Sequence, residues 1–376
     1  MALARPEEVS MIRYPLGFGA RRSWKPVVLI ALALGLFGGP ASALTYTLVP
    51  LATLDEGTTL VVRGVNASGT AVGAGRVGGA RQGLLFTQTG PRVVDGLAGS
   101  DHSTVFGIND LGAIVGGANA PTAMRAFLRT PVGITRELAP LPGDTASIAF
   151  GINRQQQAAG VSSGPGGERA VLWTTDGSAT VLPGVAGRAS HARAINDAGD
   201  VVGAADGGAG LRAVVWRGSG TAVPLGALAG RATSEALAVN ARGDVVGYSA
   251  DASGVRRATL WTAGGAMVDL GALPGGAFSQ ALGISNAGDI VGTSTSSLGS
   301  RACIWTAGGS IQDLNALVPP SSTVLTHATG INQAGVIVAF GHEAVSHAEP
   351  DDGHGHDDTH ELPVRVFLLV PSGAQP

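Results

Sequence analysis

The chain is poor in cysteine and in charge, and each scarcity excludes a class of protein. Cys303 is the only cysteine among 376 residues, so no disulfide can form within the chain. Charged residues make up only 14% and apolar residues reach 44%, a balance that does not fit disorder. Apart from residues 26–39, no long window carries an apolar stripe of helical period. We therefore expect a folded, all-β chain with many tight turns, for which its 59 glycines are suited.

Lysine is almost absent too, and the only one, Lys25, lies in a segment with the features of an export signal. An arginine pair and Lys25 come before an apolar run over residues 26–39, and Ala41-Ser42-Ala43 follows as an A-x-A cleavage site. The run is shorter than the roughly 20 residues that a permanent membrane span needs. We expect residues 1–43 to be a signal peptide cleaved after Ala43, and the protein to be exported to the bacterial periplasm or cell exterior. The start (Met1 or Met11) and the export route (general or twin-arginine) stay open.

The chain that remains after this segment is acidic. Residues 1–43 carry five basic and two acidic residues, so the formal charge falls from −3 for the whole chain to −6 for the rest. A nucleic-acid partner would call for a clustered basic surface. We therefore expect no nucleic-acid partner, no membrane association after cleavage, and a monomer whose ligand is a protein or a glycan.

The dominant feature of the mature chain is an element that returns seven times. Its clearest copy is Ala194-Ile195-Asn196-Asp197-Ala198-Gly199-Asp200-Val201-Val202-Gly203. The third position recurs every 43 to 47 residues, at Asn66, Asn109, Asn153, Asn196, Asn240, Ser285 and Asn332. A near-constant period of this length is typical of repeat architectures. Asn-Asp-Ala-Gly favours a hairpin turn over a calcium loop, because Asn bonds its own backbone, Gly supplies a positive φ, and regularly placed oxygen ligands are missing.

Each repeat divides into four short apolar segments, A to D, which in the fourth repeat are residues 190–195, 200–203, 212–216 and 223–228. Four strands in about 44 residues is the content of one β-propeller blade. The last repeat ends with its C segment, and the missing D segment stands at the front of the mature chain, at residues 49–54. The first segment can supply the strand that the last repeat lacks only if the two ends of the chain meet in a closed ring. We predict a seven-bladed β-propeller over residues 44–369, with a tail at 370–376, in which the N-terminal strand completes the last blade and removes the free edges.

Two further positions recur in a way that predicts packing. The residue before Ile or Val in segment A is always small, as expected if the seven A strands converge on the axis. These residues are Gly64, Gly107, Gly151, Ala194, Ala238, Gly283 and Gly330. The slot that ends segment C is mostly aromatic, which predicts packing between neighbouring blades rather than a ligand platform. It holds Phe86, Arg129, Trp173, Trp216, Trp261, Trp305 and Leu369. We expect Arg129, the exception, to mark a blade edge open to solvent, and Cys303 to be a small buried strand residue rather than a nucleophile.

Three elements that recur in fixed order make the chain resemble a known family. Ile-Asn-x-x-Gly-x-Val-Val-Gly, x-Ala-Phe/Val-Leu-Trp and Asp-Leu-Gly-x-Leu-x-Gly-Gly together look like the bacterial extracellular HAF repeats, over nearly all of the mature chain. The name-giving His-Ala-Phe triplet is replaced, and its best match is Arg125-Ala126-Phe127. The resemblance implies export and a propeller-like repeat fold. It implies no catalytic residue.

The seventh repeat carries an insertion over residues 341–363, between its B and C segments. Other repeats need 9 or 10 residues between these segments, and this one needs 26. The insertion contains five of the eight histidines and seven acidic residues. Its candidate metal ligands, of types that suit Zn, Ni or Cu, are His354, His356, His360, Asp357 and Asp358. Glycines between them make ordering the segment costly, so metal capture and a solvated acidic loop both stay open, and we expect no required cofactor.

These features favour a binding protein over an enzyme. The sequence has no Gly-rich phosphate loop followed by a helix and no nucleophile elbow, and most acidic residues outside the insertion sit in repeat slots, where residues usually serve the fold. We expect a non-catalytic binding or interaction module at the cell surface or in the periplasm, with no catalytic residue to name. The alternative is an extracytoplasmic polysaccharide lyase or hydrolase. It would need two or three non-repeating polar residues that converge at the mouth of the ring.

The metal-capture hypothesis makes a direct prediction. A synthetic peptide covering residues 341–363 should bind Zn²⁺ or Ni²⁺ near pH 7.5 and release it below about pH 6, because imidazole must be neutral to coordinate a metal. Isothermal titration calorimetry measures both states. An absence of binding heat near pH 7.5 would rule out metal capture by this segment.

Overall fold

The computed structural model describes residues 44–54, 61–120, 123–185, 189–218, 220–307, 310–343 and 364–373. The expected signal peptide and residues 344–363 of the insertion lie outside the described residues. The described chain folds into seven sheets of four antiparallel strands each. Apart from 3-10 turns such as η2 (Leu314–Ala316), its regular structure is β-strand, so the predicted all-β class is confirmed.

The four strands of each sheet follow the predicted A, B, C and D segments. The innermost strands are β2 (Val61–Val65), β6 (Ser103–Ile108), β10 (Ala146–Ile152), β14 (Ser190–Ile195), β18 (Thr233–Val239), β22 (Ser279–Ile284) and β26 (Thr323–Ile331). The second strands are β3 (Ala71–Val77), β7 (Ile114–Asn119), β11 (Ala158–Gly164), β15 (Val201–Asp206), β19 (Val245–Ala250), β23 (Ile290–Ser296) and β27 (Ile337–Glu343). The third strands are β4 (Ala80–Thr87), β8 (Met124–Arg129), β12 (Gly167–Trp173), β16 (Leu211–Trp216), β20 (Arg256–Trp261), β24 (Gly299–Trp305) and β28 (Val364–Pro371). The outer strands are β5 (Gly90–Val94), β9 (Thr135–Leu138), β13 (Ala179–Val181), β17 (Val223–Gly226), β21 (Met267–Asp269), β25 (Ile311–Asp313) and β1 (Tyr46–Leu54).

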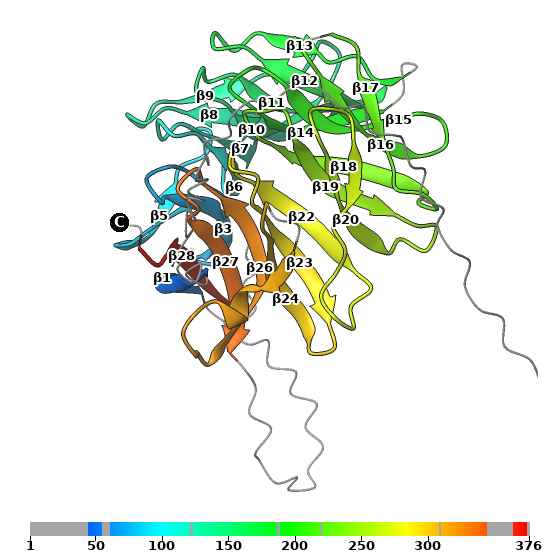
Figure 1. Ribbon diagram of the computed structural model, residues 1–376. Helices are drawn as coiled ribbons and strands as arrows, with labels where there is room; N and C mark the ends of the chain where they lie inside the picture. The colour runs from blue at the N-terminus through cyan, green and yellow to red at the C-terminus, as the bar shows by residue number, and fades with distance from the viewer. Residues whose placement is uncertain are drawn as a thin grey trace, which may run out of the picture. The chain divides into compact units, whose positions relative to one another are not determined.

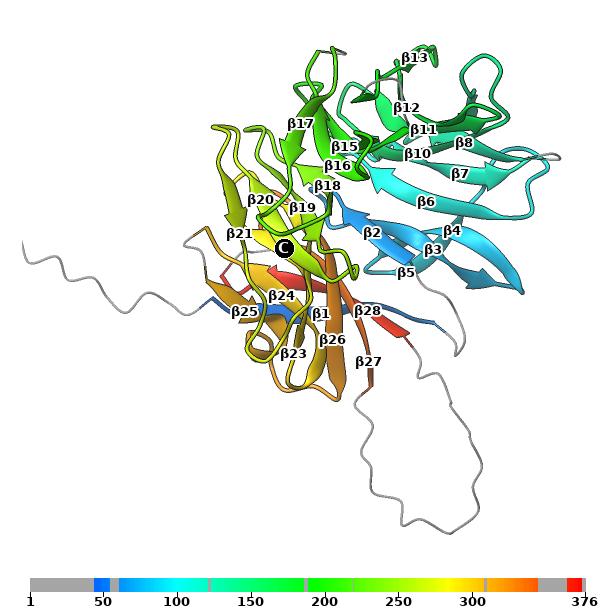
Figure 2. The same ribbon diagram turned by 90° about the vertical axis from the view of Figure 1, so that its right-hand side faces the viewer.

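The ring is closed by the strand that comes first in the chain. Each innermost strand contacts those of both neighbouring blades, and β2 contacts β26 (Figure 1). Strand β1 pairs antiparallel with β28, with Tyr46 opposite Pro371 and Leu54 opposite Val364. Both views place blue β1 beside red β28, at the outside of the last blade (Figures 1 and 2). The predicted seven-bladed ring, completed by its N-terminal strand, is confirmed.

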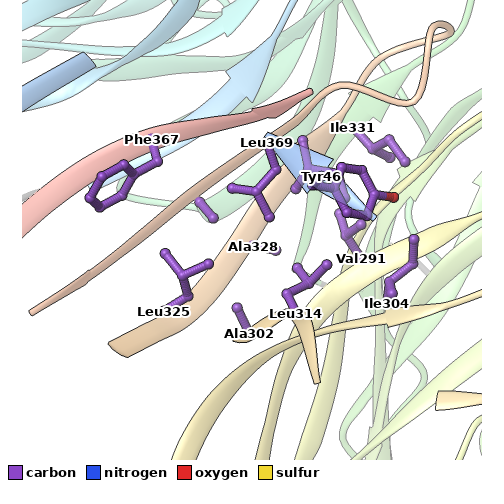
Figure 3. Close-up of a cluster of buried hydrophobic side chains, with 12 residues drawn as sticks. Tyr46, Val291, Ala302, Ile304, Leu314, Leu325, Ala328, Ile331, Phe367 and Leu369 are labelled. Atoms are coloured by element: carbon purple, nitrogen blue, oxygen red, sulfur yellow. The ribbon is translucent and has the colours of Figure 1, made fainter. Parts of the chain in front are cut away.

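The apolar core lies between the blades rather than in one central mass. Among the described residues, seven buried clusters each join two neighbouring blades. In the cluster between the sixth and seventh blades, Tyr46 of β1 lies close to Leu369 of β28 and Val291 of β23 (Figure 3). Closing the last blade therefore also completes a core that faces the sixth blade.

The aromatic slot packs between blades as predicted. Trp173, Trp216 and Trp305 are buried, and each donates its indole N–H to a backbone carbonyl of the preceding blade at 2.7–2.8 Å. Arg129 was expected at an open edge, but its side chain is only 27% exposed and its guanidinium lies 4.0 Å from the Asp95 carboxylate of the preceding blade. Arg129 connects the same two blades through this ion pair, because Phe127, two residues earlier, fills the apolar cluster between them.

The repeated asparagine links each blade to the next. Its side-chain oxygen accepts from backbone N–H groups of its own turn, as Asn196 does from Ala198 and Asp200. Its side-chain nitrogen donates across the junction to the backbone carbonyl of the equivalent residue in the next blade. The six donors are Asn66, Asn109, Asn153, Asn196, Asn240 and Asn332. The last of these bonds joins the seventh blade to the first, so the chain of bonds runs around the ring and is interrupted only at Ser285, whose shorter side chain reaches no neighbouring blade.

The next residue of the turn adds a second link in four blades. Asp110, Asp197, Asn286 and Gln333 each accept a backbone N–H from the turn of the preceding blade at 2.8–2.9 Å. Sequence reasoning assigned this variable position to hairpin geometry alone. Its acceptor side chains also connect the blades.

At two of the recurring glycine positions, a neighbouring backbone lies too close for a side chain. A Cβ on Gly203, which ends the repeated Val-Val-Gly, would lie 2.0 Å from the carbonyl oxygen of His191 on the adjacent strand. A Cβ on Gly107 would lie 2.7 Å from the carbonyl oxygen of Phe150 on the next blade. The second contact shows that the innermost strands of the second and third blades approach each other too closely for a side chain at Gly107.

The interrupted link at Ser285 generates a stability prediction. Ser285→Asn should supply the missing bond to the backbone of Asn332 and raise the free energy of unfolding by about 1 kcal/mol. Asn240→Ala should lower it by about 1–3 kcal/mol, because a buried carbonyl and two turn N–H groups lose their partner. Urea unfolding measures both changes, with Ser285→Ala as the control for altering this position. A neutral Asn240→Ala variant would contradict the structural role of the links.

Candidate functional site

The innermost strands carry one position per blade whose residue type varies around the ring. In each of the seven blades the pairing of the first two strands shifts register around this residue, which forms a β-bulge. All seven bulged residues line the central channel: Arg63, Phe106, Phe150, Arg193, Leu237, Leu282 and Thr329. Bulges re-aim side chains, so the fold presents to the channel a position that holds arginine, phenylalanine, leucine or threonine in different blades.

The channel widens into a pocket at one end, the mouth. The pocket has a volume of about 310 Å³ and is lined by the bulged residues together with Glu235, Arg256 and Gln280. Glu235 and Gln280 lie near the start of the innermost strands, and Arg256 opens β20. The mouth therefore lies at the end of the ring opposite the asparagine turns.

Four bulged side chains of consecutive blades form a continuous stack along one side of the mouth. The guanidinium of Arg63 lies 5.8 Å from the centre of the Phe106 ring, and that of Arg193 lies 4.8 Å from the Phe150 ring. The two phenylalanine rings meet edge to face at 5.0 Å. Cation–π and edge-to-face contacts hold these groups in place. Blades one to four thus give the mouth an aromatic and cationic wall. Blades five to seven line it with smaller, uncharged side chains, namely Leu237, Leu282 and Thr329.

Glu235 is the centre of a buried polar network beside this wall. Its Oε1 lies 2.6 Å from Nε of Arg193 and 3.0 Å from Nε2 of His191, and its Oε2 accepts from the Tyr248 hydroxyl at 2.7 Å. The guanidinium of Arg256 lies 4.2 Å from the centre of the Tyr248 ring and donates to Gln280. The network connects the fourth, fifth and sixth blades and orders the groups that surround the opening.

The network moves the pKa values of two members, Glu235 and Tyr248, away from neutrality. Burial alone would raise the pKa of Glu235, but the hydrogen bond from His191, the charge of Arg193 and the hydrogen bond from Tyr248 together lower it to about 2. Burial, followed by the hydrogen bond to Glu235 and its charge, raises the pKa of Tyr248 to about 12. At neutral pH the first stays a carboxylate and the second stays a phenol, so both hold the site rather than exchange protons.

Arg63 differs from the other arginines of the mouth. Within the described part of the chain, no carboxylate lies within ion-pair distance of Arg63. Its guanidinium there contacts only the Phe106 ring, through a cation–π interaction. Its side chain is exposed to the channel although protein surrounds the channel on every side. This partial desolvation, followed by the positive charges of Arg193 and Arg81, lowers its pKa. A guanidinium in this setting favours an added negative charge.

The candidate metal ligands of the insertion lie outside the described residues: they are His354, His356, His360, Asp357 and Asp358. Within the described residues, no group of three potential metal ligands occurs. The flanks of their segment are described: Glu343 ends β27, Val364 begins β28, and Glu343 forms an ion pair with Arg365. Glu343 pairs with Thr323 at the start of β26, and Val364 pairs with His342 of β27, so the insertion begins and ends on the same face as the mouth.

Cys303 has the structural role that its sequence context predicted. It is fully buried between the fifth and sixth blades, and burial raises the pKa of its thiol well above the usual value. No helix within the described residues is long and apolar enough to cross a membrane.

Comparisons with known proteins support the fold alone. No protein-family model matches the chain, and no curated protein matches it. A solved streptogramin B lyase structure aligns over 87% of this chain and 98% of its own, with a TM-score of 0.51 and 13% identity. An inactive virginiamycin B lyase from Staphylococcus aureus, solved with quinupristin, aligns over 87% and 99% with a TM-score of 0.51 and 12% identity. The propeller domain of the Trilobed protease from Pyrococcus furiosus aligns over 85% and 97% with a TM-score of 0.53 and 9% identity. The protein is a seven-bladed β-propeller with a ligand-sized opening on its axis.

The Glu235 network generates a pH prediction. A carboxylate whose pKa is lowered by folding stabilises the protein above its unfolded-state pKa of 4.5, and this contribution is lost as the pH falls towards 2. Glu235→Gln should therefore lower the free energy of unfolding by about 2–3 kcal/mol near pH 6. The difference from the wild type should shrink markedly by about pH 3.

Denaturant unfolding at both pH values measures this difference. Glu168→Gln is the matched control, because Glu168 is 60% exposed and lies 4.0 Å from His191. A Glu235→Gln deficit that stays constant over this pH range would contradict the proposed state of the carboxylate.

Proposed function

We propose that this protein is an exported, non-catalytic binding module whose ligand enters the mouth of the central channel. The observation that carries the proposal is the contrast between the repeated and the non-repeated positions. Residues that recur blade by blade connect strands and blades, whereas the bulged residues that line the channel vary among arginine, phenylalanine, leucine and threonine. Function on such folds is located where the scaffold presents side chains that it does not itself need.

The chemistry of the mouth favours binding over turnover. Proton transfer near neutral pH needs a group with a pKa close to that range. Glu235 and Tyr248 have been moved far below and far above it, and both are already hydrogen-bonded. The polysaccharide lyase or hydrolase alternative needs free polar residues at this point, and the arginines present there can position an anion but do not serve as acids or bases.

Export and the resemblance to HAF repeats belong to this proposal. The signal peptide predicted at residues 1–43 and the resemblance to extracellular repeats both support a location in the periplasm or at the cell surface. A binding module at that location meets small metabolites, glycans and proteins. An opening of about 310 Å³ suits a small ligand or the end of a chain rather than a folded partner.

Blocking the channel tests the proposal. Leu282 is half-buried in the lining, so Leu282→Trp should fill the opening and abolish binding of any ligand that uses it. Leu111→Trp is the control, because Leu111 is 53% exposed in an asparagine turn on the opposite face. A thermal-shift screen of organic acids, sugar acids and neutral oligosaccharides should give hits that raise the melting temperature of the wild type and of Leu111→Trp only.

Two outcomes would count against this function. Hits that stabilise Leu282→Trp as well as the wild type would show that the ligand binds outside the channel. Hits that the protein converts to a product, detected by mass spectrometry, would favour the enzyme alternative.

A further inference from the structure

The mouth is cationic in a chain that is otherwise acidic. Three arginines and a single glutamate line it, whereas the whole chain has a formal charge of −3. Arg81 adds a fourth positive charge close enough to affect Arg63. A concave site lined by one sign of charge raises the local concentration of the opposite sign. The expected ligand is therefore an anion.

Only one of these arginines is uncommitted. Arg193 is paired with Glu235, Arg256 donates to Gln280, and Arg81 donates to Thr104. Arg63 has the Phe106 ring and no hydrogen-bond acceptor among the described residues. A guanidinium presents its N–H groups as a planar fork that matches the two oxygens of a carboxylate. The site thus offers one fork to one planar anionic group.

Four of the residues that line the mouth are apolar and favour a ligand with an apolar part. Phe106 and Phe150 form one wall, and Leu237 and Leu282 lie on the blades opposite. Burying apolar ligand surface against them contributes roughly 25 cal/mol per Å². A bare inorganic anion would leave this surface unused.

We propose that the mouth binds a small organic carboxylate with an apolar body, held by the Arg63 guanidinium at its charged end and by Phe106, Leu237 and Leu282 along its length. This inference rests on the proposed binding function, since it assigns a ligand class to the same opening. Arg193 acts as a positioning residue, because its bond to Glu235 fixes the far end of the aromatic wall.

Calorimetric titration of the mature protein with four probes tests the ligand class. The probes are 3-phenylpropionate, its neutral amide, acetate and 2-phenylethylphosphonate. The carboxylate should bind at least tenfold more tightly than the amide, which lacks the charge, and than acetate, which lacks the apolar body. Its affinity should fall as the ionic strength rises. Tighter binding of the phosphonate or of the amide would overturn the assignment.

A matched set of variants tests the role of Arg63. Arg63→Gln should weaken binding of 3-phenylpropionate about 10- to 100-fold, as expected for loss of a charged hydrogen-bond pair. Arg63→Lys should fall between this variant and the wild type, because it keeps the charge and loses the fork. Arg92→Gln, an exposed arginine on outer strand β5, should bind as the wild type does. Since Arg63 is exposed and lacks a hydrogen-bond partner, all variants should melt at similar temperatures.

The outcomes separate this inference from the function on which it rests. If Leu282→Trp abolishes binding of some ligand that Arg63→Gln leaves unchanged, the channel is a binding site but its ligand is not a carboxylate held by Arg63. If 3-phenylpropionate binds equally well to Leu282→Trp, both the ligand assignment and the channel site are wrong.

Discussion

The interaction on which the ring depends is the bond from each turn asparagine to the backbone of the next blade. One side chain does two things: its oxygen closes its own hairpin, and its nitrogen reaches the neighbouring hairpin. Because the innermost strands converge at the axis, these turns lie close enough for a short side chain to span the junction. The bond from Asn332 to Asn66 uses the same geometry to join the last blade to the first.

This repetition explains how much of the fold could be predicted. A residue that makes the same contact in every blade recurs at the same step along the chain, so periodicity alone located the hairpins, the converging glycines and the interblade tryptophans. The permuted segment at residues 49–54 then predicted the closure that the pairing of β1 with β28 shows. The position of Arg129 was predicted wrongly, because its partner Asp95 belongs to another blade and no local sequence pattern indicates the pair.

The candidate site was missed for the opposite reason. The bulged residues are of four types among the seven blades, and their positions lie directly before the small residues that sequence reasoning had already aligned. An alignment of the seven repeats could have flagged them as the position that departs from the pattern. It could not have shown that Arg193 is held by Glu235 or that Arg63 is left without a carboxylate, since both depend on side chains of distant blades. The His-rich insertion, which the sequence did single out, begins and ends on the face where the mouth opens.

The chain therefore divides into positions that build the ring and positions that face its axis, and we place function in the second group. A crystal structure of residues 44–376 with 3-phenylpropionate tests this division most directly. We predict the carboxylate on the Arg63 guanidinium, with the phenyl ring between Phe106 and Leu282. A ligand bound on the outer strands, or in the channel with its carboxylate turned away from Arg63, would contradict it.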